Sequence, residues 1–393
     1  MPVPHQVMIK FTRIMEEVVR RIDPRPERLR GLAIAFLLAG AAGILFTVLH
    51  LPLPWMLGPL FLSLALSSMG RPLESPDFLV FPARALVGVG IGASFTPELL
   101  SKGGGALFSI LMMIPYSLFI TVVGIWFLSR FARFDRATSF FSAAPGGLSD
   151  MMFFALDSGA DIRKVTLVQT ARVLMIVCIV PFWLQYVGGL PLGGAMPKSI
   201  SIVDLPFSHF VSIFFLAGAG WWLGLKLGLK GASMMGPLIL SGLLHITSFT
   251  IVKVPAEALV FVQVTIGIVI GAHFVGITMR EFTTVLFWGF LFSSFLVAAA
   301  GAWALVVAPL SGLDATTVFL SYVPGGQVEM AILGLILGLD VAILATHHII
   351  RVSIVILGAQ IVMNRYPEWA VEAEKAKARA KSKPKSEPGG GGH

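Results

Sequence analysis

The stretch Ala144-Pro145-Gly146-Gly147 decides the fold, because it recurs as Val323-Pro324-Gly325-Gly326 in the second half of the chain. An acid follows three positions after each second glycine, Asp150 in the first copy and Glu329 in the second. The displacement that takes Pro145 to Pro324 also relates further pairs: Gly88 with Gly267, Gly92 with Gly271, Asp135 with Asp314, Asp161 with Asp340 and Arg172 with Arg351. The chain is therefore a tandem duplication. In membrane proteins such a duplication indicates a carrier whose site lies where the two repeats meet.

Composition places both repeats in a membrane. Of 393 residues, 56% are apolar and only 13% are charged, and the mean hydropathy is +0.86. Apolar runs of about 20 residues recur, each long enough to cross roughly 30 Å of hydrocarbon. We therefore expect an all-α polytopic membrane protein with a lipid bilayer as its surroundings. The single cysteine, Cys178, excludes an intramolecular disulfide.

The net charge of +8 is concentrated at the two ends of the chain. Residues 1–30 read as a basic amphipathic segment on the cytoplasmic membrane surface, and residues 364–393 as a disordered basic cytoplasmic tail. Because these clusters flank membrane segments, they favour cytoplasmic retention over nucleic-acid binding. We expect a multi-pass protein of the cytoplasmic (inner) membrane with both termini in the cytoplasm and no nucleic-acid partner.

Between the ends lie two membrane repeats, residues 31–190 and 205–363, each with six apolar segments. The segments of the first repeat are 31–50, 54–69, 78–95, 104–128, 139–157 and 165–186. Those of the second are 207–228, 232–251, 258–275, 282–309, 315–338 and 341–363. The fifth segment of each repeat carries Pro-Gly-Gly at its middle, where an α-helix cannot continue unbroken.

The broken segment can either cross the membrane or enter and leave on one side. Basic loop residues accumulate on the cytoplasmic side. Re-entrant fifth segments place nine basic loop residues inside and three outside, whereas crossing segments divide them equally. The charge bias favours re-entrance. Five crossings a repeat would then make the halves inverted, a 5+5 plan, whereas crossing segments would give a parallel 6+6 protein.

The Pro-Gly-Gly turns, which form the tips of the two broken segments, are candidate substrate sites. Each Pro-Gly-Gly frees the backbone and begins a half-helix, whose unpaired N–H groups and positive dipole end suit an anion. The residues expected to contact the substrate here are Pro145, Gly146, Gly147 and Ser149 in the first repeat and Pro324, Gly325, Gly326 and Gln327 in the second. Asp150 and Glu329 either cap these helix starts or bind a coupling ion, and both roles can coexist.

An arginine lies deep in the last helix of each repeat. Arg351 follows Asp340 by 11 positions, which places it about 16 Å along a helix, and Arg172 is its first-half equivalent. At that depth each arginine needs a partner. One alternative is an ion pair with the acid of its own repeat. The other is direct binding of an anionic substrate, which the guanidinium fork suits.

Three histidines are candidates for handling a coupling ion. His347 and His348 precede Arg351 by four and three positions, and their first-half equivalents are not histidine. This asymmetry is expected if the second half is specialised for coupling or proton relay, and the alternative is a pair of hydrogen-bonded interhelical histidines. His273 lies on the third helix of the second repeat, beyond Gly267 and Gly271. Those glycines predict close helix packing.

The aligned repeats resemble the membrane AbrB family, also described as the AbrB duplication family. The resemblance covers about residues 31–363. It rests on the duplicated domain, on both Pro-Gly-Gly motifs, and on Trp55-Met56-Leu57-Gly58-Pro59 with Met234-Met235-Gly236-Pro237. The family carries the labels ammonia monooxygenase and transcriptional regulator, which the resemblance implies without a mechanism. An oxygenase would need a metal site, and no ligand set stands out in the sequence.

The sequence therefore predicts a secondary active transporter and not an enzyme. Its expected substrate is a small anionic organic molecule coupled to H⁺ or Na⁺, bound near the midplane at the repeat interface, with no cofactor and no metal. A homodimer is compatible with this plan. The first alternative is a membrane-embedded sensor or regulator that affects gene expression indirectly, and the second is a membrane metal oxygenase.

Overall fold

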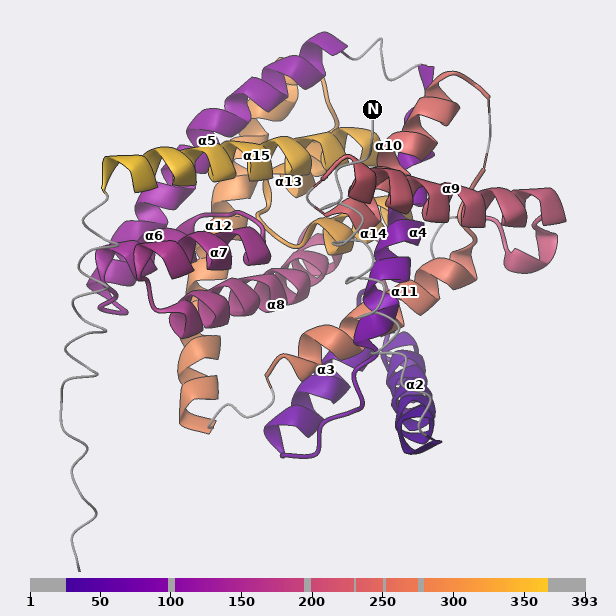
Figure 1. Cartoon of the computed structure of the whole chain (residues 1–393), viewed down its shortest axis with the longest axis horizontal. Coiled ribbons are helices and arrows are strands. Elements are labelled where there is room, and N and C mark those ends of the chain that lie inside the picture. The colour runs from indigo at the N-terminus through magenta and orange to yellow at the C-terminus, as the bar shows by residue number, and fades with distance from the viewer. Residues whose placement is uncertain are drawn as a thin grey trace, which may run out of the picture. The chain divides into compact units, whose positions relative to one another are not determined.

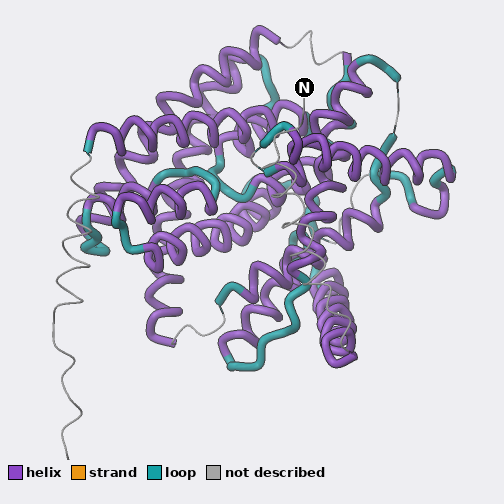
Figure 2. The backbone as a smooth tube through the Cα atoms, in the orientation of Figure 1, coloured by secondary structure: helices purple, strands orange, loops and turns teal. Residues whose placement is uncertain are grey.

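The protein is helical almost throughout, as the computed structural model shows (Figures 1 and 2). It describes residues 26–97, 103–193, 199–229, 231–249, 252–274 and 279–366, and the basic segment and tail predicted at the two ends lie largely outside these ranges. The chain packs as two compact units. One comprises the described parts of residues 1–112 and 172–348, and the other those of 113–171 and 349–393. Helices α5, α8 and α15 each contribute to both units.

The two repeats produce matching series of helices. The first series is α2 (Pro26–Val48), α3 (Pro54–Ser68), α4 (Val80–Gly92), α5 (Gly103–Arg130), α6 (Arg136–Ala143), α7 (Leu148–Ser158) and α8 (Ile162–Tyr186). The second is α9 (Phe207–Lys226), α10 (Ala232–Ile246), α11 (Ala256–Ala272), α12 (Met279–Ser311), α13 (Ala315–Tyr322), α14 (Gln327–Leu337) and α15 (Val341–Arg365). Each series ends with helices of 8, 11 and 25 residues. The prediction of an all-α protein with two repeats, each with a broken fifth segment, is confirmed.

Six helices of the described chain are long and apolar enough to cross a membrane: α2, α5, α8, α9, residues 287–311 of α12, and α15. Large apolar side chains lie exposed on these helices, among them Leu37, Leu118 and Leu305 at 74%, 65% and 78%. A water-soluble surface rarely tolerates that much exposed apolar area. This protein is therefore a multi-pass membrane protein, and these side chains are suited to lipid.

The unit of residues 1–112 and 172–348 is organised by helix pairs that exchange partners between repeats. Helix α3 of the first repeat packs on α11 of the second, and α10 of the second packs on α4 of the first. Glycines permit both approaches. A Cβ at Gly267 of α11 would lie 2.5 Å from the carbonyl oxygen of Met56, and a Cβ at Gly88 of α4 would collide with the carbonyl of Met234.

A pair of serine hydrogen bonds repeats the same exchange. The hydroxyl of Ser63 on α3 donates to the carbonyl of Ile268 on α11 at 2.8 Å. The hydroxyl of Ser241 on α10 donates to the carbonyl of Val89 on α4 at 3.0 Å. The third helix of the second repeat therefore contacts the second helix of the first, and the second helix of the second repeat contacts the third helix of the first. This is the reciprocal pattern of a two-fold contact. The close packing that the glycine spacing predicted is present, and it joins the two repeats to each other.

Candidate functional site

In both fifth segments the first helix ends at the Pro-Gly-Gly motif and a second helix begins after it. In the first repeat α6 ends at Ala143 and α7 begins at Leu148, with Gly147 as its N-cap. In the second, α13 ends at Tyr322 and α14 begins at Gln327, with Gly326 as its N-cap. Proline has no N–H, so the carbonyl four positions before each motif proline loses its helical donor. A buried carbonyl left this way needs another partner.

The last helix of each repeat supplies that partner from one equivalent position. The amide Nε2 of Gln169 donates to the carbonyl of Phe141 at 2.8 Å and to that of Ala144 at 3.1 Å. In the second repeat, Nε2 of His348 contacts the carbonyl of Leu320 at 3.1 Å. Because a carbonyl oxygen only accepts, Nε2 of His348 carries the hydrogen of this bond. His348 therefore stabilises the break in the helix, a task that the sequence did not predict for it.

Replacing His348 by glutamine should cost little stability, because Gln169 makes the same bond at the equivalent position. Leucine at position 348 would leave the Leu320 carbonyl buried without its donor and should cost about 1–3 kcal/mol. The thermal midpoints of the two purified variants, measured in one detergent, separate these outcomes. Equal melting of His348→Gln and His348→Leu would contradict the assigned role, and Gln169→Leu provides the matched test in the first repeat.

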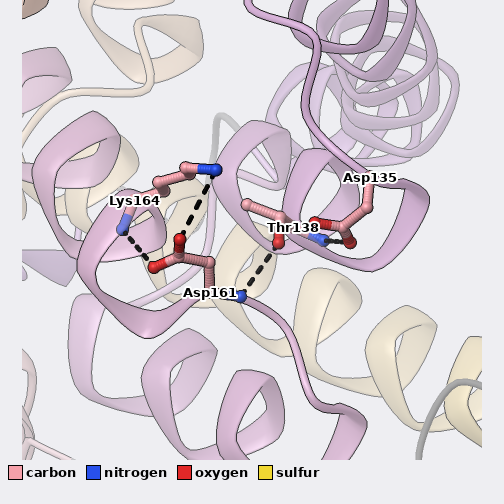
Figure 3. Close-up of polar contacts among 4 residues, drawn as sticks. All are labelled: Asp135, Thr138, Asp161 and Lys164. Carbon is pink, nitrogen blue, oxygen red and sulfur yellow. Dashed lines mark hydrogen bonds and ion pairs between the residues drawn. The ribbon is translucent and has the colours of Figure 1, made fainter. Parts of the chain in front are cut away.

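Polar contacts close the first hairpin at its base (Figure 3). Asp135 caps α6 by accepting a bond from the backbone N–H of Thr138 at 2.9 Å. The hydroxyl oxygen of Thr138 accepts from the N–H of Asp161 at 2.9 Å, and the Asp161 carboxylate pairs with Lys164 at 3.5 Å. The segment that follows the end of α7 thus returns to the start of α6. The two ends of the first fifth segment lie together, as a re-entrant hairpin requires.

The second tip holds a buried acid. Glu329 is 8% exposed, and its carboxylate lies over the Cα of Gly326, in the space that a Cβ at that position would fill. It therefore sits at the positive end of α14, where a negative charge is stabilised. The amide nitrogen of Gln327 is buried without a hydrogen-bond partner at the same helix start.

Arg84 of α4 is a charged neighbour of this acid. Its guanidinium interacts electrostatically with Glu329, and His273 at the C-cap of α11 lies within electrostatic range of Asp77 and of Arg84. The structure thus groups Glu329, Arg84 and His273, two of which were predicted. Arg84 was missed as a site residue. The available signal was its alignment with Gln263, a neutral residue, in the equivalent helix.

Arg172 lies on α8, the first-repeat helix that packs against the same tip. It is 4% exposed on α8, one turn before Ile176. A Cβ at Gly325 would lie 2.9 Å from Ile176 Cγ2, so this face of α8 packs against the second Pro-Gly-Gly motif. Residues four apart share a helix face. The first-repeat arginine therefore lies on the side of α8 that meets the second-repeat tip.

The remaining predicted residues belong to the first motif and its surroundings. Arg351 on α15 is 3% exposed and falls in the unit of residues 113–171 and 349–393, together with Pro145, Gly146 and Gly147. Ser149 and Asp150 occupy the first turn of α7 in that unit, but their side chains lie outside what the structure describes. Whether Arg351 pairs with Asp150 stays a prediction.

His347 is buried among polar groups that the sequence did not single out. Its Nδ1 contacts the carbonyl of Ile343 at 2.8 Å, and its Nε2 contacts the hydroxyl of Ser109 at 2.8 Å. The phenol of Tyr322 donates to the carbonyl of Ser109. Ser109 and Tyr322 come from α5 and α13, which are distant from His347 along the chain, so no local pattern could have indicated them. In the described part of the chain, no group of three His, Cys, Asp or Glu residues is placed to hold a metal ion.

Duplicated apolar repeats, broken helices and buried charges together define a duplicated polytopic membrane protein. The family model described as "Transition state regulatory protein AbrB" matches residues 55–366. The chain belongs to this AbrB family, as the motifs predicted.

Two relatives share most of the chain. One, from Bacillus subtilis (strain 168), bears the name "Uncharacterized protein YhjN" and is 28% identical over 347 residues, which cover 81% of this chain and 88% of that protein. The other, from Escherichia coli (strain K12), bears the name "Putative regulator AbrB" and is 24% identical over 316 residues, which cover 79% and 89%. The duplicated membrane region is thus shared nearly whole.

Proposed function

We propose that the protein is a secondary active transporter of a small anionic organic solute, coupled to H⁺ or Na⁺. One observation carries the proposal. The second Pro-Gly-Gly motif, where a half-helix begins, packs against α8 of the first repeat at Ile176, one turn from the buried Arg172. A helix start and a buried arginine from different repeats thus lie on elements that pack together, and both favour an anion.

In this proposal each group has a separate task. The N–H groups of Gly325, Gly326 and Gln327 and the guanidinium of Arg172 hold the substrate carboxylate, with Ser149 and Arg351 serving the first tip in the same way. Glu329, Asp150 and the histidines His347 and His273 respond to the coupling ion. Glu329 rests where an anionic substrate would bind, so substrate entry and movement of the Glu329 carboxylate are linked by charge repulsion.

The proposal also specifies the membrane and the topology of the protein. Inverted repeats in the cytoplasmic (inner) membrane, with both termini in the cytoplasm, would let the two tips approach the midplane from opposite faces. The closed base of the first hairpin supports this arrangement, because a re-entrant segment leaves an odd number of crossings in its repeat. The protein acts in this reading without a cofactor or catalysis of its own, and a homodimer fits the same plan.

The test uses the purified full chain in sealed liposomes. A thermal-shift screen of small carboxylates, amines and neutral metabolites selects ligands, since a ligand that binds the folded state raises its melting point. Flux of a selected carboxylate is then followed under imposed pH or Na⁺ gradients. We expect Arg172→Gln to lower flux at least about tenfold, a change of roughly 1.4 kcal/mol. The exposed Arg130→Gln removes the same charge and should have no effect. Absence of any solute movement in the wild type would refute the proposal.

The name of the Escherichia coli relative supports one alternative, a membrane-embedded regulator. Such a protein would act through a cytosolic partner, for which the basic tail is the natural docking segment. Deletion of residues 370–393 separates the two functions: a transporter should keep its flux, whereas a regulator should lose its partner.

A further inference from the structure

The buried cluster of His347, Ser109 and Tyr322 can accommodate a proton without breaking its hydrogen bonds. In the neutral state, Nδ1–H of His347 donates to the Ile343 carbonyl and Nε2 accepts from the Ser109 hydroxyl, each at 2.8 Å. The Tyr322 hydroxyl donates to the Ser109 carbonyl, and its oxygen lies 3.5 Å from the Ser109 hydroxyl oxygen. Every polar atom of the three side chains then has a defined role.

A proton added to Nε2 requires the rotation of only one hydroxyl. The imidazolium would donate from Nε2 to the Ser109 oxygen, and the Ser109 hydrogen would turn toward the Tyr322 oxygen 3.5 Å away. The Tyr322 hydrogen stays on the Ser109 carbonyl. A buried polar group left without a partner would destabilise the protein, and this rearrangement avoids that in both states. The proton therefore enters and leaves at a single nitrogen.

The cluster joins Ser109 of the first repeat to Tyr322 and His347 of the second, and the set of residues that the duplication makes equivalent does not repeat it. At the displacement that relates Pro145 to Pro324, the three cluster residues Ser109, Tyr322 and His347 correspond to Trp288, Ala143 and Val168. None of the three equivalents can accept or relay a proton. By contrast, the neighbouring His348 corresponds to Gln169 and makes the same helix-stabilising bond. The functional difference between the two equivalent locations therefore lies in the residues around His347, because His348 has an equivalent that makes the same bond.

Helices α5, α12 and α13 contribute groups that face His347 or its partners. Helix α13 contributes Tyr322, whose ring centre is 5.9 Å from that of His347, and α5 contributes the uncharged Ser109. Trp303 of α12 faces the Tyr322 hydroxyl and carries no charge. On α15 itself His348 is the next residue, and Arg351 follows one turn later.

We propose that His347 is the coupling-proton site of this protein, with Ser109 as the rotating hydroxyl that serves both protonation states. The inference rests on the proposed transport function and names H⁺, not Na⁺, as its coupling ion. Proton uptake converts the neutral imidazole to imidazolium at Nε2, and its release restores the starting state. The three side chains include no carboxylate, so the charge that arrives here is carried by the imidazole.

Histidine nitrogen resonances of the full chain in detergent micelles test the site directly. With ¹⁵N-histidine labelling of all eight histidines, the signal that is missing from His347→Gln should titrate reversibly between pH 5 and 8 in the wild type. Ser109→Ala removes the partner of the charged form and should abolish that titration. Ser293→Ala is the matched control, because Ser293 is another buried serine whose hydroxyl has no hydrogen-bond partner.

The outcomes keep this inference separate from the transport proposal. A His347 signal that stays unchanged from pH 5 to 8 in the wild type would overturn the proton site, whatever the liposomes show. Titration without any flux would uphold the proton site and overturn transport. If a flux is found, a pH gradient should drive it in the wild type and not in His347→Gln. A flux driven by Na⁺ alone and unaffected by His347→Gln would overturn H⁺ coupling.

Discussion

Gly267→Ala should strongly destabilise the fold. The new Cβ would lie 2.5 Å from the Met56 carbonyl oxygen, and this neighbour is backbone on another helix that cannot turn aside. Overpacking of this kind costs about 3 kcal/mol or more, so the melting temperature should fall by about 5 °C or more. Gly88→Ala should behave in the same way, because its Cβ would meet the Met234 carbonyl. The measurement is thermal unfolding of the purified variants, together with the fraction that elutes as a single species.

The control for this prediction is a helical glycine with open space around it. A Cβ at Gly218 of α9 would meet nothing within 4 Å. Alanine there should leave the melting temperature unchanged or raise it slightly, since alanine favours a helix over glycine by about 0.5–1 kcal/mol. If Gly267→Ala melted like Gly218→Ala, the crossed packing of α3 on α11 would be wrong.

Gly326→Ala should strongly reduce the proposed transport while leaving the fold intact. Gly326 has φ −67°, which alanine adopts without strain, so α14 should still form. The methyl group would take the place of the Glu329 carboxylate, a side chain that can move away. Displacing this acid from the helix start should reduce flux at least about tenfold, equivalent to roughly 1.4 kcal/mol, with the melting temperature nearly unchanged. Liposome flux and thermal unfolding measured on one preparation decide it.

A shorter acid provides the matched rescue. Aspartate at position 329 corresponds to Asp150 of the first repeat and reaches one methylene less far. The double variant Gly326→Ala/Glu329→Asp should therefore recover part of the flux. Unchanged flux in the single variant would show that the position of the carboxylate is irrelevant to transport.

The sequence predicted the local features of this fold well. Proline and glycine end a helix through their own backbone chemistry, so the helix breaks at Pro145 and Pro324 could be predicted directly from the sequence. Glycines four positions apart predicted close packing, which Gly267 and Gly271 show. The partners of these glycines were not predictable, because they lie in the other repeat and no local period encodes them.

The residues of the candidate site could be predicted only in part, because some of their partners are distant along the chain. Glu329 and Arg172 stand out as charges in apolar helices, whereas Ser109 and Tyr322 look ordinary in the sequence. Their importance arises only when α5 and α13 bring them to His347. His348 shows the converse. Its place beside His347 suggested ion handling, and the structure gives it the bond to the carbonyl that Pro324 leaves free.

The exchange of partners between α3, α4, α10 and α11 bears on how such a chain could have originated. Each repeat presents a glycine face that the other repeat covers. A protein made of one repeat would meet this need by associating with a second copy of itself, each copy covering the other. Gene fusion would then preserve a contact that already existed. It would also free the two halves to diverge, which is how one of two equivalent locations could gain the histidine cluster while the other has valine, alanine and tryptophan.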